Sequence, residues 1–426
     1  MSSLSNLGEK DASFVWHPFT QAAVEGSPIV IKKAEGVFLY DENDRQYIDA
    51  NSSWWVNIHG HGNAFIADAI YEQCKTLDHI IFAGFTHPKA IELSERLLKW
   101  MPTQMQKVFF SDDGSTAVEV ALKMAFQFWD NQQNSRKRIL ALEGAYHGDT
   151  FGAMSVGQRG YFNKPFEHFF FDVDFLEFPT TDNQHILLEQ AEKLFQTHEF
   201  AAIILEPLVQ GSAGMRMYGV DFLEQITNLA KKYQVLVILD EIMTGWGRTG
   251  EMFAFNHGAI HSDIICLSKG LTGGVLPLGL TVATQEIFDA FLSEDKSKAL
   301  LHGHSFTGNA LACAAACANL TLFENPEVFE NIARIQRQHM QFKASLTYKR
   351  VKEVRMMGTI LAIELTDSQE DYFSSLRDEA YHFFLENGIL LRPLGNVIFI
   401  NPPYVIDNEN LTYIYENIRN FISNLK

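Results

Sequence analysis

The sequence predicts an α/β fold: a large domain whose mostly parallel sheet is flanked by helices, joined to a smaller α+β domain. Short apolar runs alternate with longer amphipathic segments from residue 107 onward, which is typical of parallel strands connected by crossover helices. After Asn325-Pro326 the pattern changes to helical segments and short strands. A chain of 426 residues with 46% hydrophobic residues can bury the cores that both domains need.

The large domain is expected over residues 60–320, and its sheet over six apolar runs. These runs are residues 108–110, 138–142, 201–205, 235–239, 264–267 and 280–283. Apolar residues at helical spacing predict helices over 117–129, directly after Gly114-Ser115-Thr116, and over 222–233.

The small domain is expected over residues 321–426. It begins with a predicted helix over 327–346, followed by the segment 354–365, a helix over 371–387 and short strands over 389–392 and 397–401. The N-terminal segment, 1–59, contains short strand-like stretches at 29–32 and 36–41. We expect it to pack with the small domain.

Charge and hydropathy limit the classes of partner. The formal net charge of -18 and the absence of a basic run disfavour nucleic acid and anionic membranes, which require clustered Lys and Arg. The first eleven residues are polar, and no apolar stretch approaches the length of a membrane span. A cytoplasmic protein is expected.

The cysteines and histidines do not indicate a metal site. Four cysteines occur without metal-finger spacing, and we expect them to be buried free thiols. Two His-Gly-His triplets, at 59–61 and 302–304, lack further ligands at metal-site spacing. No metal is therefore predicted.

Two strand ends place an amine and a carboxylate where they can meet. Lys269 follows the run 264–267 through a small-residue turn, and Asp240 follows the run 235–239. Parallel strands end at one edge of a sheet, so both side chains can reach a common site. An aldehyde cofactor with a basic ring nitrogen needs such a pair: a Schiff-base lysine and an acid.

Two glycine-containing segments compete as phosphate-binding sites. Residues 245–250 match G-x-G-x-x-G, but the segment that follows, 251–258, is too short and too aromatic for the long helix of a dinucleotide site. Residues 111–116 lie between a predicted strand and a predicted helix, where backbone N–H groups can hold a phosphate. An ordinary capped helix explains this segment equally well when it is taken alone.

Motifs along nearly the whole chain resemble the class III (fold type I) pyridoxal-phosphate aminotransferases. They are Asp113-Gly114-Ser115, Tyr146-His147-Gly148, Glu206-Pro207, Asp240-Glu241 with the glycines at 245–250, Lys269, and the segment 303–309. The resemblance implies the cofactor pyridoxal 5'-phosphate. It also implies catalytic roles for Lys269, Asp240 and Tyr146, with the last lying over the cofactor ring. Gly114 and Ser115 would bind the phosphate together with Ser305 of a second subunit, in a homodimer.

Within this class the chain is similar to the branch that acts in biotin synthesis. The matching stretches include residues 16–21, Ser52-Ser53-Trp54-Trp55, residues 146–155 and residues 214–218. This resemblance implies 8-amino-7-oxononanoate as amino acceptor and S-adenosylmethionine as donor. The substrate-binding residues that it implies are Phe19, Trp54, Trp55, Gly303 and Arg392.

Departures from the branch leave the donor open. Phe19 stands where users of S-adenosylmethionine commonly have tyrosine, and His304-Ser305 stands where they have Pro-Thr. Lysine is therefore an alternative donor. A general ω-aminotransferase acting on ornithine or 4-aminobutyrate would share Lys269, Asp240 and the phosphate loop. A nicotinamide-dependent dehydrogenase and a cofactor-binding regulator fit the sequence less well, because the required helix and a DNA-binding segment are both missing.

Overall fold

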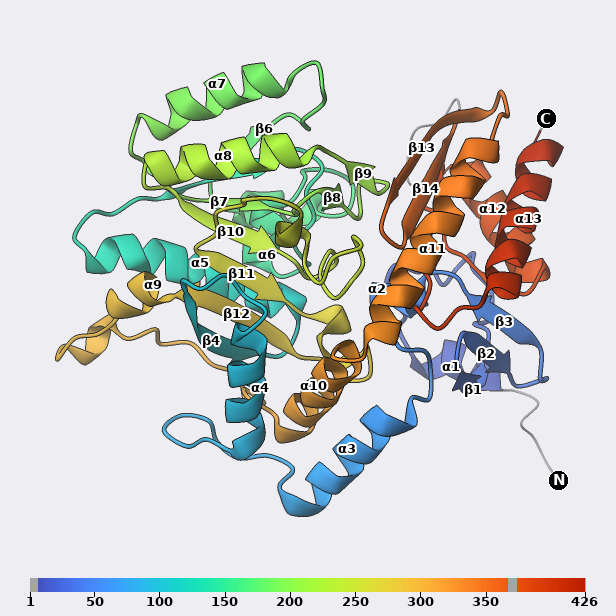
Figure 1. Ribbon diagram of the computed structural model, residues 1–426, viewed down its shortest axis with the longest axis horizontal. Helices are drawn as coiled ribbons and strands as arrows, with labels where there is room; N and C mark the ends of the chain where they lie inside the picture. The colour runs from blue at the N-terminus through green and yellow to red at the C-terminus, as the bar shows by residue number, and fades with distance from the viewer. Residues whose placement is uncertain (1–6, 367–373, 426) are drawn as a thin grey trace.

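The structure is a computed structural model that describes residues 7–366 and 374–425. A large lobe built on a wide sheet lies beside a smaller lobe, and the short helix α2 (Ser52–Trp55) lies between them (Figure 1). The predicted α/β class is confirmed. Part of the predicted helix over 371–387 falls on 367–373, outside the described residues.

Seven strands form the central sheet, in the order β4-β12-β11-β10-β7-β5-β6. Their bounds are Met105–Ser111, Gly279–Thr284, Ile264–Leu267, Leu236–Asp240, Phe200–Leu205, Arg138–Leu142 and Val173–Leu176. All neighbours are parallel except β12, which runs antiparallel to β11 and to β4. The six predicted runs are therefore strands of one mostly parallel sheet, and β6 is an addition to them.

Helices cover both faces of this sheet because the strands are apolar on both faces. Ile238 belongs to the core beneath α5 (Gly114–Asn131), whereas its neighbours Val237 and Leu239 belong to the core that includes residues of α8 (Val220–Lys232). Successive strand residues point to opposite faces, so one apolar run serves two cores. Helix α7 (Gln184–Phe195) packs on α8.

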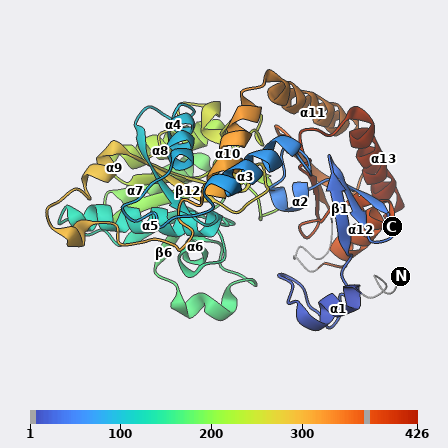
Figure 2. The same cartoon turned by 90° about the horizontal axis from the view of Figure 1, so that it is seen from below.

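The small lobe has a three-stranded antiparallel sheet, β13 (Val351–Met357), β14 (Ile360–Leu365) and β16 (Val397–Ile400). The segment 354–365, to which no single helix or strand was assigned, lies mostly in the hairpin of β13 and β14. The helices of this lobe are α11 (Pro326–Ser345), α12 (Ser375–Glu386) and α13 (Asn408–Asn424), of which α13 was not predicted. In the second view α11 and α13 lie on the outer side of the lobe (Figure 2).

The N-terminal segment joins this lobe through a second sheet, ordered β1-β2-β3-β15. Three strands come from the segment, β1 (Ile31–Glu35), β2 (Phe38–Asp41) and β3 (Gln46–Asp49), and β15 (Ile389–Leu390) comes from the C-terminal part. Parallel pairing of Ile389 with Ile48 fixes their register. The exact domain boundaries, 59/60 and 320/321, stay predictions.

The remaining elements connect the lobes or cover their edges. They are α1 (Leu7–Phe14), α3 (Ala64–Thr76), α4 (Pro88–Leu98), α6 (Phe151–Val156), α9 (Gln285–Asp289), α10 (Ala310–Phe323), the hairpin β8 (Val209–Gln210) and β9 (Arg216–Met217), and the 3-10 helices η1 (Lys164–Phe169), η2 (Ala254–His257), η3 (Lys269–Thr272) and η4 (Lys296–Lys298). Residues 251–258 contain η2 and no long helix, which agrees with the rejection of a dinucleotide site.

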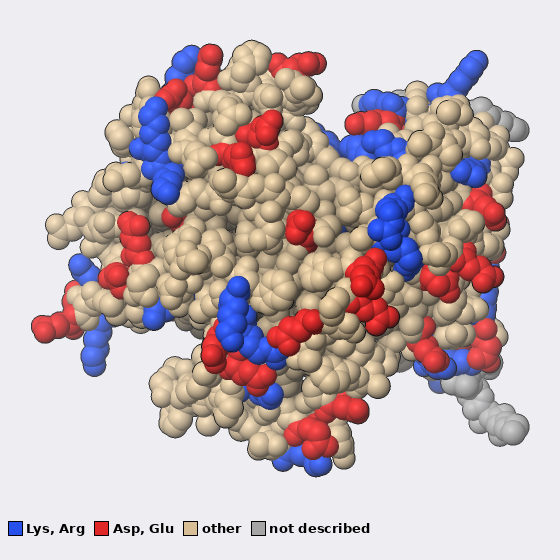
Figure 3. Space-filling model, in the orientation of Figure 1, with Lys and Arg blue, Asp and Glu red and all other residues tan. Residues whose placement is uncertain are grey.

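The hydropathy of the helices, the surface charges and the cysteines can be compared with the predictions. No helix among residues 7–366 and 374–425 is long and apolar enough to span a bilayer. On the face drawn in Figure 3, basic and acidic side chains lie next to one another. All four cysteines are free, but the prediction of buried thiols is wrong for Cys74, which is exposed on α3, whereas Cys266, Cys313 and Cys317 are buried.

Candidate active site

A cavity of about 420 Å³ opens at the carboxyl edge of the sheet. Residues that directly follow five strands line it: Asp113 to Ser115 after β4, Tyr146 to Gly148 after β5, Glu206 after β7, Asp240 at the end of β10, and Ser268 and Lys269 after β11. Parallel strands bring their carboxyl ends to one edge, where open α/β sheets bind ligands. Topology therefore assembles residues that are up to 156 positions apart, from Asp113 to Lys269.

Lys269 presents its amine to this cavity from the first position of η3. Its backbone has a φ of 48°, in the left-handed region that a lysine rarely adopts. Burial lowers the pKa of Lys269, and the negative charges of Asp240 and Glu206 oppose that effect in part. The amine has no hydrogen bond or ion pair with any residue that the structure describes. A buried, unpaired amine is suited to react with a carbonyl group.

Asp240 is held by two groups at the end of β10. Its Oδ2 atom lies 2.7 Å from Nδ1 of the buried His147, and its Oδ1 atom accepts a hydrogen bond of 3.1 Å from the Ile242 N–H. A carboxylate fixed in this way is suited to pair with a protonated ring nitrogen. On the far side of the imidazole, Nε2 of His147 is buried without a hydrogen-bond partner among the described residues.

The first turn of α5 forms the other end of the cavity. Asp113 caps the helix: its Oδ1 atom accepts from the Thr116 N–H at 2.8 Å, and the Thr116 hydroxyl oxygen accepts from the Asp113 N–H at 2.9 Å. Gly114 and Ser115 follow, and the N–H groups of a first turn have no partner within the helix. Together with the helix dipole they form an anion site.

Gly148 allows its own backbone to approach Ser115, at the start of α5, very closely. A Cβ atom on Gly148 would lie 2.1 Å from Ser115 Oγ, and the φ of Gly148 is +125°. A side chain is excluded here on both grounds. The close approach of residues 146–148 to the start of α5 leaves a cradle of backbone and hydroxyl groups.

Tyr146 and Glu206 form the wall between these two ends. The Tyr146 hydroxyl donates to Asp149 Oδ2 at 3.0 Å, and burial raises the pKa of this phenol. Glu206 accepts from the backbone N–H groups of Tyr146 and Gly211, each at 3.0 Å. Burial raises the pKa of Glu206 to about 7. In the sequence Glu206 was only part of a motif and had no predicted role. It directly follows the apolar run 201–205, as Asp240 follows the run 235–239, so the same pattern could have identified it.

The two tryptophans of α2 point to different places. Trp55 is buried and lines the cavity, with its ring centroid 5.1 Å from Lys269 Nζ. Trp54 is 45% exposed and lies outside, 5.4 Å from the Phe19 ring and 5.6 Å from the Arg392 guanidinium. Phe19, Trp54 and Arg392 are thus brought together beside the cavity, not within it.

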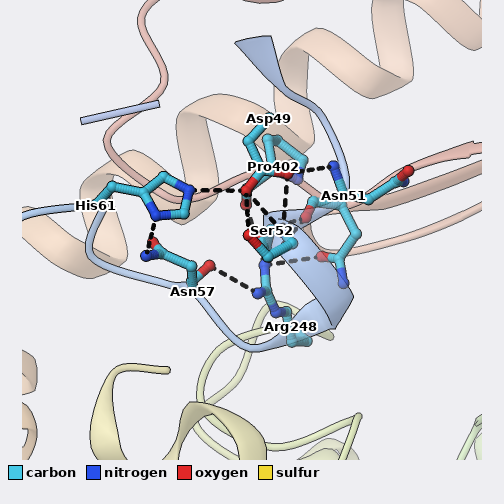
Figure 4. A network of polar contacts seen from close by, with 9 residues as sticks. Asp49, Asn51, Ser52, Asn57, His61, Arg248 and Pro402 are labelled. Carbon is cyan, nitrogen blue, oxygen red and sulfur yellow. Dashed lines mark hydrogen bonds and ion pairs between the residues drawn. The ribbon is translucent and has the colours of Figure 1, made fainter. Parts of the chain in front are cut away.

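A polar network holds the backbone around α2, the helix that carries both tryptophans (Figure 4). Ser52, Ser53 and Trp55 all have positive φ, and Ser53 donates through N–H and hydroxyl to the Asp49 carboxylate. That carboxylate is buried and also lies 2.9 Å from His61 Nε2. Several bonds are needed here because each positive φ at a residue other than glycine costs about 1 kcal/mol or more.

Gly303 and Ser305 do not reach the cavity of their own subunit. Both are exposed in the loop before α10, where the Ser305 carbonyl oxygen lies 2.7 Å from His79 Nε2. The predicted roles of Gly303 and Ser305 require a second copy of the chain, so they stay predictions.

Two buried polar residues, Arg248 and Tyr218, support the site from outside the cavity. Arg248 is buried and donates to the Asn57 carbonyl and to Asn401 and Pro402 of the small lobe. Tyr218 is buried and donates to the Glu206 carbonyl at 2.7 Å. Neither lines the cavity.

Comparison with known proteins decides the family. The model of the class-III aminotransferases matches residues 20–422. This chain belongs to the class-III aminotransferase family. It is 43% identical to the adenosylmethionine-8-amino-7-oxononanoate aminotransferase of Synechococcus elongatus, over 96% of this chain and 99% of the relative. It is 36% identical to the enzyme of that name from Staphylococcus aureus, over 100% and 99%.

Solved structures of other aminotransferases are also similar to this chain. The adenosylmethionine-8-amino-7-oxononanoate aminotransferase of Methanocaldococcus jannaschii superimposes with a TM-score of 0.92 at 35% identity, covering 99% of both chains. A PLP-bound amine transaminase from an uncultivated Pseudomonas species has a TM-score of 0.90 at 29% identity, covering 96% of this chain and 98% of that chain. The enzyme is a transaminase that depends on pyridoxal 5'-phosphate.

The cavity fits this cofactor on chemical grounds. It offers one unpaired amine for the aldehyde, one buried carboxylate for the ring nitrogen, and the N–H groups of a helix start for the phosphate. The glycine at 148 leaves the space that a phosphate needs next to Ser115. Four features that the family's cofactor requires thus occur around one cavity.

Proposed function

We propose that this aminotransferase converts 8-amino-7-oxononanoate to 7,8-diaminononanoate in biotin synthesis, with S-adenosylmethionine as amino donor. The observation that carries the proposal is the cluster of Phe19, Trp54 and Arg392 beside the cavity. It offers apolar surface for an aliphatic chain and, at its end, a guanidinium for a carboxylate. The names of the relatives at 35% to 43% identity support the same substrates.

The proposed roles follow from the positions of the side chains. Bound in the cavity, pyridoxal phosphate supplies an electron sink for the substrate carbon. Lys269 Nζ would take the proton from that carbon and deliver it to the carbon that had been the cofactor's aldehyde, so that the amino group stays on the cofactor; a lysine with a lowered pKa can do this efficiently near neutral pH. With the cofactor bound, Asp240 would keep the ring nitrogen protonated, Tyr146 would pack on the ring, and Gly114 and Ser115 would hold the phosphate.

The residues outside the cavity would bind the acceptor chain and complete the site. Trp55 forms the apolar wall nearest Lys269, and Trp54 and Phe19 continue it outward to Arg392. Gly303 and Ser305 would come from the second subunit of a homodimer and complete the substrate and phosphate sites. Their exposure in one copy of the chain supports this proposal. The expected cytoplasmic location also stays a prediction.

The donor can be tested by the colour of the cofactor. Purified yellow enzyme is mixed with S-adenosylmethionine and, separately, with lysine, and the conversion to the pyridoxamine form is followed by absorbance. The proposal predicts conversion by S-adenosylmethionine alone. Conversion by lysine alone would show that Phe19 and His304-Ser305 mark a different donor specificity.

A general ω-aminotransferase is the second candidate, because omega transaminases are also similar in structure, at 27% identity and a TM-score of 0.91 for that of Thermomicrobium roseum. Conversion of the yellow form by ornithine or 4-aminobutyrate, but by neither S-adenosylmethionine nor lysine, would favour it. The proposed acceptor would then have to be abandoned.

A further inference from the structure

Phe162 extends the aromatic surface beside the cavity to the large lobe. Its ring centroid lies 6.0 Å from that of Phe19, at an interplanar angle of 71°, and Phe19 lies 5.4 Å from Trp54. We call these three rings, Phe19, Trp54 and Phe162, the aromatic row. They come from three separate segments: the N-terminal segment, α2, and the loop between α6 and η1.

The row is anchored at the Trp54 end. Trp54 lies close to both the Phe19 ring and the Arg392 guanidinium. The Asp49 network holds the backbone of the preceding residues (Figure 4). Phe19 itself has a φ of 53°, which is uncommon for an aromatic residue and costs conformational free energy. Contacts on both of its sides help to keep it in that conformation.

The loop that carries Phe162 is anchored to the catalytic wall. Asn163 is buried and closes the loop: its Oδ1 atom accepts from the Gly160 N–H at 3.0 Å, and its Nδ2 atom donates to the Gln158 carbonyl at 2.7 Å. Gln158 in turn bonds Gly144 and Ala145, directly before Tyr146. Phe162 is therefore fixed relative to Tyr146.

The rings of the row present open apolar surface. Phe19 is 43% exposed, Trp54 45% and Phe162 50%, whereas Trp55 inside the cavity is 6% exposed. The loop after α6 and the segment of α1 project on the same side of the molecule (Figure 2). The row thus bridges two projecting segments and ends at one cation, Arg392, which suits an aliphatic chain with a terminal carboxylate.

We propose that Phe162 is a specificity-determining residue for the amino acceptor, an inference that rests on the proposed function. Its ring forms the large-lobe wall of the channel along which the acceptor's methylene chain lies, with the acceptor's carboxylate at Arg392. Phe162 touches neither Lys269 nor Asp240 and does not line the cofactor cavity. Its effect should therefore fall on binding of the chain and depend on chain length.

The test compares Phe162→Ala with Phe162→Leu and with the control Phe166→Ala. Phe166 is 41% exposed in η1 and packs on Phe151, away from the row. Steady-state kinetics are measured with 8-amino-7-oxononanoate and with a homologue two methylenes shorter. Phe162→Ala should raise KM for the longer acceptor by about tenfold and raise KM for the shorter one less, with kcat unchanged. Phe162→Leu should have a KM close to that of the wild type, because leucine keeps most of the apolar surface. Phe166→Ala should have the wild-type KM for both acceptors.

The outcomes separate the two levels of the proposal. If wild-type enzyme does not aminate 8-amino-7-oxononanoate, the proposed function and this inference both fail. If the wild type does so but KM is unaffected in Phe162→Ala, or both acceptors lose equally, only the role of Phe162 is overturned. Thermal unfolding of each variant checks that the loop change leaves the fold intact.

Discussion

Lys269 and Asp240 bring an amine and a carboxyl group into one cavity, but the fold does not pair them with each other. Asp240 is hydrogen-bonded to His147, and the Lys269 amine makes no hydrogen bond or ion pair in the described part of the chain. Direct pairing would stabilise the lysine as a cation and prevent its reaction with a carbonyl group. Because His147 is the partner of Asp240, the Lys269 amine stays available.

Asp240→Asn tests the first of these roles. The amide side chain of this variant could still bond His147, but it carries no negative charge to hold a proton on the ring nitrogen. We expect the rate constant of the donor half-reaction to fall by about 10²- to 10³-fold, because a preorganised charge at the reacting group is lost. Stopped-flow measurement of the donor half-reaction gives the value, and a loss below about tenfold would argue against the assigned role.

Glu206 gives a prediction about pH. Burial raises its pKa to about 7 from an ordinary 4.5, so the folded state binds a proton that the unfolded state releases. The contribution of Glu206 to stability is thus present below pH 4.5 and is lost as the pH rises to 7, by roughly 3 kcal/mol for a shift of this size. Glu206→Gln should therefore gain stability relative to the wild type between about pH 5 and pH 8. Denaturant unfolding of the cofactor-free proteins measures this difference, and parallel curves would contradict it.

At the scale of the elements, the site is a set of strand ends facing one helix start. The apolar runs before Asp240, Glu206 and Lys269 are long enough to be strands, and parallel pairing then brings their ends together. The capped first turn of α5 completes the arrangement from the opposite side. Local rules therefore explain why these groups meet.

Gly148 offers a sharp test of this packing. Gly148→Ala would place a Cβ atom 2.1 Å from Ser115 Oγ at a φ of +125°, so we expect the dissociation constant of pyridoxal phosphate to rise by about tenfold or more. Gly160→Ala is the matched control, because its Cβ would meet no atom within 4 Å. Titration of the cofactor-free enzyme, followed by absorbance, measures both constants. Equal affinities would show that the cradle at Ser115 does not hold the phosphate.

The sequence was informative where structure is local and less so where it depends on distant contacts. The edge strand β6 was missed because Val173–Leu176 contains an acidic residue, is only partly buried and pairs with β5 alone. The positive φ values of α2 depend on Asp49 and Asn401, and no local pattern signals them. The contact of Phe19 with Phe162, 143 positions away, was likewise invisible in the sequence.

At the scale of the whole molecule, the cavity lies in the large lobe, whereas the residues beside it come from both lobes. Arg392 and the N-terminal segment belong to the sheet region of the small lobe, whereas Lys269 and Phe162 belong to the large one. Buried bonds from Arg248 to Asn57, Asn401 and Pro402 connect the two lobes. With the proposed roles of Arg392 and Phe19, substrate recognition would depend on how the lobes are held together. The proposed second subunit would add Gly303 and Ser305.

Formation of the diamine in the complete reaction is the decisive test of the proposed function. The enzyme with pyridoxal phosphate is incubated with S-adenosylmethionine and 8-amino-7-oxononanoate, and the product is identified by mass spectrometry, with Lys269→Ala as the control. We predict 7,8-diaminononanoate from the wild type and none from Lys269→Ala. Absence of the diamine with the wild type, together with amination of succinate semialdehyde under the same conditions, would contradict the proposed function and identify a general ω-aminotransferase instead.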